Sequence, residues 1–272
     1  MSYPAYSVLL SVSDSEKSKL LSMALDSMIN QTIEPAEIVL ILEGELTDDL
    51  NETVNQYLGK YPELLKVLPL PNGAGHGHAL RQGVLACTTG FIACMDADGY
   101  SVPTRIEEEF DALLENKVDV VGSNINLFVD SMENVVARRL FPETPELIYK
   151  YAKKERPMSH TSILMKKRVV LASGNYESCN QTEDYALFIR LLSMCAKGYN
   201  IQKPLVFKPY DDEFYRQHTG LDYFKTMIMF NKRFYRTGWF SYRNYVVRSM
   251  KNGVESFMPC AVKKLFARRL FL

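Results

Sequence analysis

The sequence has few cysteines and no long apolar run. Its five cysteines are odd in number and scattered, with no CxxC pair among them. No segment approaches the roughly 18 consecutive apolar residues of a membrane span, and the opening MSYPAYSVLLSV lacks the basic start of a signal peptide. We therefore expect neither a secreted, disulfide-stapled protein nor an integral membrane protein, but a protein with buried free thiols in a reducing compartment.

The net charge is zero, but the basic and acidic residues are unevenly distributed along the chain. The sequence has 32 basic and 32 acidic residues, yet residues 223–272 hold eleven of the basic residues and one acid. The same stretch holds 12 of the 31 aromatic residues, including Trp239. Such asymmetry predicts a polyanionic partner, either nucleic acid or an anionic lipid surface. The alternative is a basic helical region docked on an acidic body.

Short apolar runs alternate with segments of helical periodicity through the first half of the chain. The expected strands are residues 6–12, 37–42, 64–69, 91–95 and 118–121. The expected helices are residues 17–30, 48–61, 79–86 and 103–115, whereas residues 129–158 are less periodic and suggest a loop or insertion. This alternation predicts an α/β fold with a mostly parallel twisted sheet between helices. Ligands of such sheets bind at the carboxyl ends of the strands.

An acidic pair follows the fourth expected strand. Asp96 and Asp98 are two residues apart, so in an extended segment their carboxylates point to the same side. Two hard oxygen ligands at a strand end suit Mg²⁺ or Mn²⁺ with a phosphate-bearing substrate. The alternative is a simple turn, because Asp98-Gly99 is also a good turn sequence.

A second acidic pair, Glu183-Asp184, precedes the apolar stretch 185–192. Thr182 could cap a helix whose first turn holds both acids, where carboxylates interact favourably with the helix dipole. The functional alternative is a general base at the mouth of a cleft. Spacing alone favours the capping role.

A glycine-rich segment, NGAGHGHAL, lies between these regions. Gly75 and its neighbouring glycines would let the chain pass close to a diphosphate before a helix begins. Arg81 on that helix is a candidate phosphate contact. His76 and His78 resemble a metal-binding tract, but no third ligand stands at a defined spacing.

Six blocks, taken together and in order, resemble the inverting family 2 glycosyltransferases of the GT-A fold. They are SVLLSV, EIVLILEG, NGAGHGHALRQGV, FIACMDADGYSVPTRIE, MSHTSILMKKRVVLASGNY and QTEDYALFIRLL. The resemblance covers roughly residues 6–218 and implies a nucleotide-sugar enzyme of the kind common in bacterial capsule and O-antigen synthesis. It suggests a glycosyltransferase domain over residues 1–220 and a basic, aromatic helical region over residues 221–272.

The resemblance also implies a donor site. Ser11 and Ser13 match positions that contact the uracil ring, and Glu43 matches an acidic residue, usually Asp, that holds the base. Asp96 and Asp98 match the DxD pair, which binds the ribose and the metal, Mn²⁺ or Mg²⁺, on the donor diphosphate. The sequence departs from the family at Glu43, which is one methylene longer, and at residue 99, where Gly stands in place of Asp.

Further positions of the family line the catalytic cleft. Asp184 matches the catalytic base, next to Glu183. His160 and Arg216 match residues that line the cleft, and His218 is expected to approach the diphosphate or the metal. The chain has no QxxRW motif after Asp184, which favours a single-addition transferase over a polymerase.

The implied reaction is transfer of a sugar from a UDP-sugar to a saccharide acceptor on a lipid diphosphate, with inversion at the anomeric carbon. The basic aromatic tail ends in the amphipathic AVKKLFARRLFL and is expected to meet an anionic membrane surface, at the inner face of the cytoplasmic membrane. No RNA-binding signature accompanies it, so nucleic acid is disfavoured. Two alternatives stay open: a sugar-nucleotide pyrophosphorylase, whose Gly-rich signature is missing, and an inactive membrane-associated binding protein.

Overall fold

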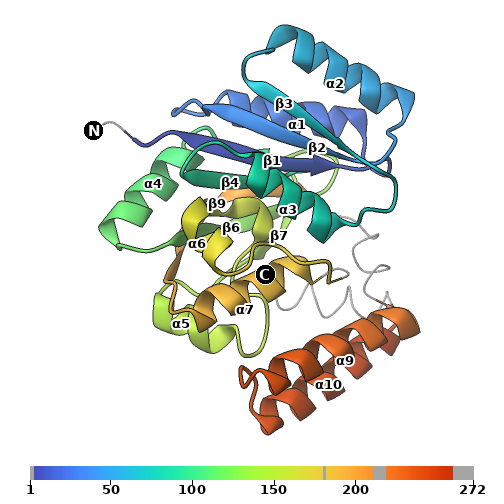
Figure 1. Cartoon of the computed structure of the whole chain (residues 1–272), viewed down its shortest axis with the longest axis vertical. Helices are drawn as coiled ribbons and strands as arrows, with labels where there is room; N and C mark the ends of the chain where they lie inside the picture. Colours follow the sequence, from blue (N-terminus) through green and yellow to red (C-terminus); the bar gives the residue numbers. More distant parts are fainter. Residues whose placement is uncertain (1–2, 180–181, 211–218, 260–272) are drawn as a thin grey trace.

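The computed structural model of the chain describes residues 3–179, 182–210 and 219–259. These residues form a mixed β-sheet with helices on both faces, followed by a helical hairpin (Figure 1). The strands are, in chain order, β1 (Tyr6–Val12), β2 (Glu37–Glu43), β3 (Leu65–Leu70), β4 (Phe91–Asp96), β5 (Tyr100–Ser101), β6 (Val120–Phe128), β7 (Val135–Arg139), β8 (Leu164–Lys166) and β9 (Gly198–Pro209). The predicted α/β class is confirmed.

The helices alternate with these strands. They are α1 (Ser18–Ile29), α2 (Asp48–Lys60), α3 (His76–Ala86), α4 (Arg105–Glu115), α5 (Pro145–Tyr151), the 3-10 turn η1 (His160–Ser162), α6 (Lys167–Ala172), α7 (Glu183–Ser193), α9 (Gly220–Arg236) and α10 (Tyr242–Phe257). Among the residues that the structure describes, no helix is long and apolar enough to cross a membrane.

The spatial order of the sheet is β3-β2-β1-β4-β8-β6-β9-β5, with β7 paired to β6. The half containing β1 to β4 is parallel, as predicted. β8 is antiparallel to both β4 and β6, and β9 is parallel to β6. It follows that β9 runs in the same direction as β4, so their carboxyl ends lie at the same edge of the sheet.

Two hydrophobic layers cover the sheet. On β1, Val8 and Leu10 face the layer formed with α1, α2 and α4, whereas Leu9 faces the layer formed with α3, α6 and α7. Because both faces are buried, the middle of the strand, Val8 to Leu10, is continuously apolar instead of alternating with polar residues. This explains why the sequence shows these strands as continuous apolar runs.

The expectation of a loop or insertion over residues 129–158 was wrong in part. This segment contains β7 and α5, and β6 extends to Phe128, well past the predicted end of that strand. Helix α5 has only seven residues, too few to show a helical period. Its start was nevertheless readable, because the Thr144 hydroxyl caps the backbone N–H of Leu147 and Pro145 occupies the first turn.

The helical hairpin α9–α10 packs on the outer side of α7. Phe230 and Phe234 of α9 share a buried cluster with Tyr185 and Ile189 of α7, and Arg248 of α10 reaches the Tyr185 hydroxyl at 2.8 Å. Residues 221–259 of the basic region are thus docked on the body of the protein, as one of the two interpretations predicted. The division into a 1–220 domain and a 221–272 region stays a prediction.

The cysteines follow the expectation only in part. Cys87 and Cys94 are buried and Cys179 is partly buried, but Cys195 is exposed in the turn after α7. All four are free thiols, and Cys260 lies outside the described residues. The small and apolar neighbours of Cys195 in the sequence therefore did not indicate burial.

Candidate functional site

The predicted donor residues meet where the central parallel strands end. Ser11 on β1 lies opposite Asp96 on β4 in the strand register, and Glu43 is the last residue of β2. Burial alone would raise the pKa of Glu43, and hydrogen bonding with Ser11 is one of the causes, after His76, that lower it. Strand pairing therefore brings three of the expected donor-binding residues to one place, as the rule for parallel sheets predicts.

The Asp96–Asp98 pair holds a lysine that the sequence did not reveal. The ammonium Nζ of Lys208 lies 2.6 Å from Oδ2 of Asp96 and 3.0 Å from Oδ1 of Asp98. Burial alone would raise the pKa of Asp96, but the charge of Lys208 and the contact with His160 hold it below its ordinary range. Both carboxylates face the same cation, as predicted, but the segment is not extended: β4 ends at Asp96, and Ala97 and Asp98 lie in the turn that the Asp98-Gly99 sequence also indicated.

The carboxylate pair fits a divalent metal whose coordination a substrate phosphate completes. Oδ1 of Asp98 is buried and accepts no hydrogen bond of good geometry, although Lys208 is within ion-pair distance. Among the residues described, there is no group of three or more His, Cys, Asp or Glu that could hold a metal. A site here thus needs the donor diphosphate or residues such as His218, which lies outside the described residues.

Gly99 closes the tight turn that contains the pair, where its backbone N–H donates to the Asp96 carbonyl at 3.1 Å. A Cβ at this position would lie 2.9 Å from the methyl carbon of Met95. The departure from the family pattern therefore matches close packing under the turn, and Asp96 and Asp98 keep their orientation without a third acid.

Glu43 is paired with His76, the first residue of α3. Oε1 of Glu43 lies 2.7 Å from Nδ1 of His76. Burial alone would raise the pKa of Glu43 and lower that of His76, but the contact between the two side chains reverses both shifts. Gly75 precedes the helix with φ +84°, a left-handed conformation that a residue with a side chain adopts with strain.

Asp184 lies in the first turn of α7, and one of its two oxygens is held in place. Nε of Arg156 donates to Oδ1 at 2.9 Å, and the backbone N–H of Tyr185 donates to the same atom at 2.7 Å. Thr182 is the N-cap residue of α7 and both acids lie in the first turn, as predicted, but its hydroxyl makes no capping hydrogen bond and instead donates to the Cys179 carbonyl at 2.6 Å. The geometry leaves Oδ2 as the oxygen that could accept a proton.

Glu183 is buried beside α3. Its Cγ would lie 2.7 Å from a Cβ built on Gly77, and the carbonyl oxygen of Glu177 would lie 2.2 Å from the same atom. The absence of a side chain at residue 77 therefore lets α3 approach the segment that leads into α7.

His160 and Tyr176 form a link next to the acidic pair. Nδ1 of His160 lies 3.5 Å from Oδ1 of Asp96, and Nε2 lies 2.9 Å from the Tyr176 hydroxyl. The charges of both Asp184 and Asp96 act on Tyr176, where burial is the main cause of a raised pKa. The predicted cleft residue His160 is thus part of the site.

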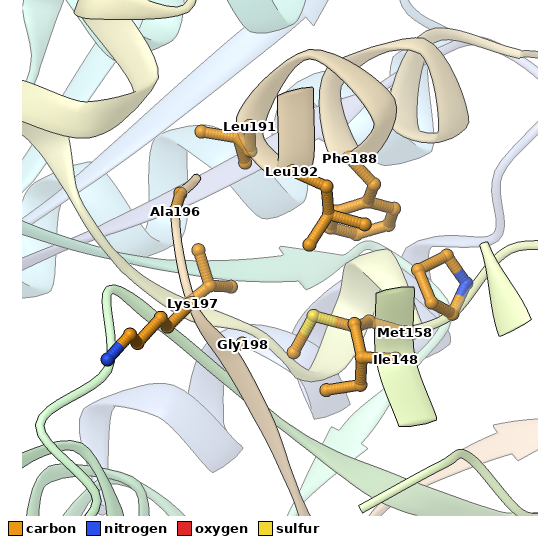
Figure 2. Close-up of a pocket in the computed structure, with 10 residues that line it drawn as sticks. Ile148, Met158, Phe188, Leu191, Leu192, Ala196, Lys197 and Gly198 are labelled. Carbon is orange, nitrogen blue, oxygen red and sulfur yellow. The ribbon is translucent and has the colours of Figure 1, made fainter. Parts of the chain in front are cut away.

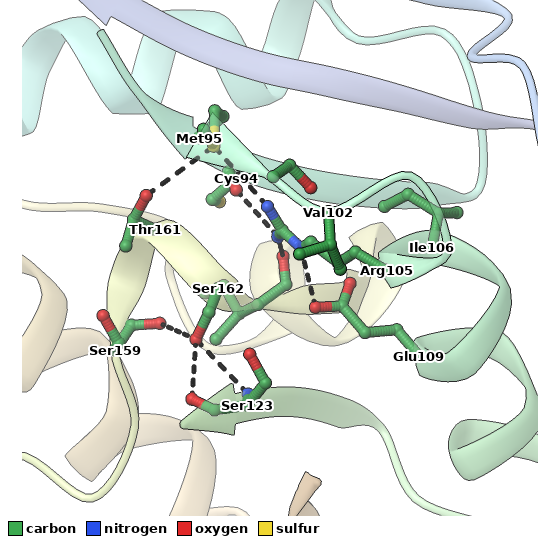
Figure 3. Close-up of polar contacts among 12 residues, drawn as sticks. Cys94, Met95, Val102, Arg105, Ile106, Glu109, Ser123, Ser159, Thr161 and Ser162 are labelled. Atoms are coloured by element: carbon green, nitrogen blue, oxygen red, sulfur yellow. Dashed lines mark hydrogen bonds and ion pairs between the residues drawn. The ribbon is translucent and has the colours of Figure 1, made fainter. Parts of the chain in front are cut away.

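A buried arginine supports the acidic strand from behind, as Figure 3 shows. Nη2 of Arg105 donates to the carbonyl oxygens of Cys94 at 3.0 Å and Ile163 at 3.4 Å, and Nε donates to Glu109 at 2.8 Å. Burial raises the pKa of Glu109 to about 7. Arg105 therefore ties β4 to the segment that holds His160.

The other predicted residues lie at the margin of this group. The hydroxyls of Ser13 and Ser15 are 2.8 Å apart in the loop after β1. Arg81 donates to the carbonyl oxygens of Gly174 at 3.1 Å and Tyr176 at 3.4 Å, so a phosphate role for it stays a prediction. Arg216 and His218 lie outside the described residues.

Figure 2 shows a small apolar pocket, which is not part of this site. Its lining includes Ile148, Met158, Phe188 and Leu191, from α5, α7 and the segment before η1. None of the predicted site residues lines it. The chemistry is therefore expected at the strand ends.

Sequence reasoning missed Lys208, Arg156 and Glu16. Burial and the nearby charge of Asp98 raise the pKa of Glu16, in the loop after β1, to about 7. Lys208 follows the apolar pair Val206-Phe207 near the carboxyl end of β9, but nothing in the spacing relates it to Asp96, which is 112 positions away. Arg156 had no signal, because its contact with Asp184 joins residues 28 positions apart.

Comparisons with known proteins agree on one family. Residues 11–172 match the model of Glycosyl transferase family 2. An uncharacterized glycosyltransferase of Haemophilus influenzae is 30% identical over 234 residues, which are 86% of each chain. A UDP-Gal:alpha-D-GlcNAc-diphosphoundecaprenol beta-1,3-galactosyltransferase of Escherichia coli is 27% identical over 261 residues, 96% of this chain and 94% of that protein.

A solved structure shares the fold. The mannosyltransferase PcManGT of Pyrobaculum calidifontis, in complex with GDP-Man and Mn²⁺, gives a TM-score of 0.66 at 14% identity. The alignment covers 93% of this chain and 70% of that one. At this identity the likeness establishes the architecture of the sheet and helices.

Proposed function

Because the chain belongs to glycosyl transferase family 2, we propose that it transfers a sugar from a UDP-sugar to a saccharide on a lipid diphosphate. It is a glycosyltransferase of the GT-A fold, and its relatives serve O-antigen and exopolysaccharide synthesis. The observation that carries the proposal is the arrangement of Asp96 and Asp98 at one strand end, linked through His160 to Tyr176, with Asp184 at the start of α7 near enough for its charge to act on Tyr176.

The donor and acceptor classes are supported by one relative. The Escherichia coli enzyme named for UDP-Gal and a diphosphoundecaprenol-linked sugar aligns with 96% of this chain. Ser11 and Glu43, at the ends of β1 and β2, are suitably placed to meet the nucleoside. Asp96 is adjacent in the register and would meet the ribose and diphosphate.

Asp184 is the proposed general base. Arg156 and the Tyr185 N–H fix Oδ1, so Oδ2 takes the proton of the acceptor hydroxyl. The acceptor oxygen then forms a bond to the anomeric carbon, while the bond from that carbon to the diphosphate oxygen breaks. The electron pair leaves with UDP, and the single displacement inverts an α-linked donor to a β-linked product.

A divalent metal would be held by Asp98 and Asp96, with His218 as a further candidate ligand. When bound, Mn²⁺ or Mg²⁺ supplies positive charge next to the departing diphosphate. The chain contributes the fixed orientation of the carboxylates, which the Gly99 turn and the Arg105 contact behind β4 maintain.

The test is UDP release from a panel of UDP-sugars, with a lipid-diphosphate saccharide acceptor and either Mn²⁺ or EDTA. We expect metal-dependent release from one donor and a β-linked product by NMR. Asp184→Asn should lower turnover by about 10²- to 10⁴-fold, whereas Asp111→Asn, on the exposed side of α4, should leave it unchanged. Near-normal turnover of Asp184→Asn would remove it from the mechanism, and a retained anomeric configuration would refute inversion.

The hairpin α9–α10 offers a surface for the membrane that carries such an acceptor. Val247, Met250, Val254 and Phe257 recur every three or four residues along α10 and are between 57% and 68% exposed. Lys232, Arg236 and Arg243 are exposed on the same hairpin. Apolar side chains next to cations suit an anionic lipid surface, so we assign the hairpin to the inner face of the cytoplasmic membrane.

Substitution tests this surface better than truncation, because α9 buries side chains of α7. A Val247→Ser, Met250→Ser, Val254→Ser variant should bind phosphatidylglycerol vesicles about tenfold more weakly in co-sedimentation. A matched variant, Leu85→Ser with Leu114→Ser, removes exposed apolar side chains elsewhere and should bind normally. Equal binding of all three proteins, or binding that does not depend on salt, would refute the assignment. If the wild type elutes as a dimer in size-exclusion chromatography and the triple variant as a monomer, the face belongs instead to a contact with a second copy of the chain.

A further inference from the structure

Lys208 occupies the position where a metal on the acidic pair would lie. Its ammonium is within 3.0 Å of one oxygen from each carboxylate. The side chain is 24% exposed, so the ion pair is only partly screened by solvent. Lys208 comes from β9, whose carboxyl end shares the sheet edge with β4.

A divalent metal and this ammonium need the same oxygens. Metal–oxygen bonds to Mg²⁺ are about 2.0–2.1 Å long, and Nζ is 2.6 Å from Oδ2 of Asp96, so a metal bonded to this oxygen would lie no more than about 4.7 Å from Nζ. Two cations this close repel strongly in a partly buried site, and they would compete for the same carboxylate lone pairs. One of them must leave.

We propose that Lys208 is an internal counter-ion of Asp96 and Asp98, which a divalent metal displaces, so that ammonium and metal occupy the pair in alternation. The inference rests on the proposed donor site. Its consequence is that metal alone binds weakly, because the displaced ammonium loses two anionic partners. The diphosphate of the donor offers the ammonium a new partner, so metal and donor bind together.

A purely structural ion pair makes a different prediction. If Lys208 only braced the strand ends, its removal would weaken the site and would leave metal affinity equal or lower. If Lys208 competes with the metal, its removal raises metal affinity. The direction of the change in affinity separates the two roles.

The first measurement is Mn²⁺ binding to the full chain without nucleotide, followed by the EPR signal of free Mn²⁺. Lys208→Met keeps the length of the side chain and removes its charge, and we expect it to bind Mn²⁺ at least about tenfold more tightly than the wild type. Lys203→Met is the matched control on β9, because Lys203 pairs with Glu108 and is 71% exposed; its Mn²⁺ affinity should be unchanged. Equal or weaker binding by Lys208→Met would overturn the proposal.

A second measurement uses the unaltered protein and stands if the variant fails to fold. Acylation of lysines by acetic anhydride, followed by mass spectrometry, should modify Lys208 several-fold faster with saturating Mn²⁺ than with EDTA, while Lys203 reacts equally in both. An unchanged rate at Lys208 would refute displacement. Neither measurement depends on sugar transfer, so absent UDP release would refute the proposed function without deciding this point.

Discussion

Glu37 provides a test of how the parallel half of the sheet is held together. It is buried at the start of β2, where its Oε1 accepts hydrogen bonds from the Ser7 hydroxyl at 2.5 Å and from the N–H and hydroxyl of Thr88 at 2.5 and 2.8 Å. Oε2 pairs with Lys66 of β3 at 2.5 Å. A single carboxylate thus joins three strands and the turn before β4.

These contacts determine how far the pKa of Glu37 shifts on folding. Burial alone would raise the pKa of Glu37, but Lys66, Ser7 and Thr88 lower it from 4.5 to about 2. The unfolded chain therefore takes up a proton at a higher pH than the folded one. The stabilisation is fully present above pH 4.5 and is lost as the pH falls through about 2, and the shift corresponds to about 3 kcal/mol of unfolding free energy.

The assay is urea unfolding of the wild type and Glu37→Gln at a series of pH values from 7 to 3. The glutamine oxygen can still accept from Ser7 and Thr88, but its amide faces Lys66, which is 52% exposed and can turn to solvent. We expect the unfolding free energy of Glu37→Gln to be about 2–3 kcal/mol lower than that of the wild type at pH 7, and we expect this difference to become smaller as the pH falls. Glu34→Gln, an exposed neighbour, should change stability by less than about 0.5 kcal/mol. A constant difference across the pH series would refute the reasoning.

Two further predictions concern the contacts of α7 and of the segment that precedes it. Gly77→Ala should lower the unfolding free energy by about 1–3 kcal/mol despite the better helix propensity of alanine, because its Cβ would lie 2.2 Å from the Glu177 carbonyl oxygen. Gly59→Ala, which has open space around it, should raise Tm instead. A higher Tm in both variants would contradict this packing. Arg156→Gln should lower kcat about tenfold or more with little change in donor KM, because Asp184 loses the donor that orients it; unchanged kcat in steady-state kinetics would rule out that role.

The parallel half of the fold was predictable because burial on both faces leaves long apolar runs such as YSVLLSV and EIVLILE. The other half was not. β8 has three residues and β7 has five, so neither is long enough to show a period. β9 spans 12 residues, but its middle is exposed and includes Pro204, which obscures the strand pattern.

Within the site, local spacing predicted what is local. Asp96 and Asp98 face one cation, as their spacing predicted, but through a turn and not through an extended segment, because β4 ends at Asp96 and the Gly99 N–H bonds back to its carbonyl. The partners of these groups come from distant parts of the chain, and Lys208 is 112 positions from Asp96. Hydrogen bonds of that kind leave no trace in spacing, so the cation between the two acids and the arginine beside Asp184 required the structure.

Helix α7 is covered on two sides, and this limits how the enzyme could acquire a new acceptor. Leu187 and Phe188 face the sheet, whereas Tyr185 and Ile189 face the hairpin. A chimera that took only the C-terminal hairpin from a relative would pack Tyr185 and Ile189 against side chains from that relative. Recombination between relatives should therefore preserve function only when the crossover lies upstream of α7, so that the helix that carries Asp184 is inherited with the hairpin that covers it.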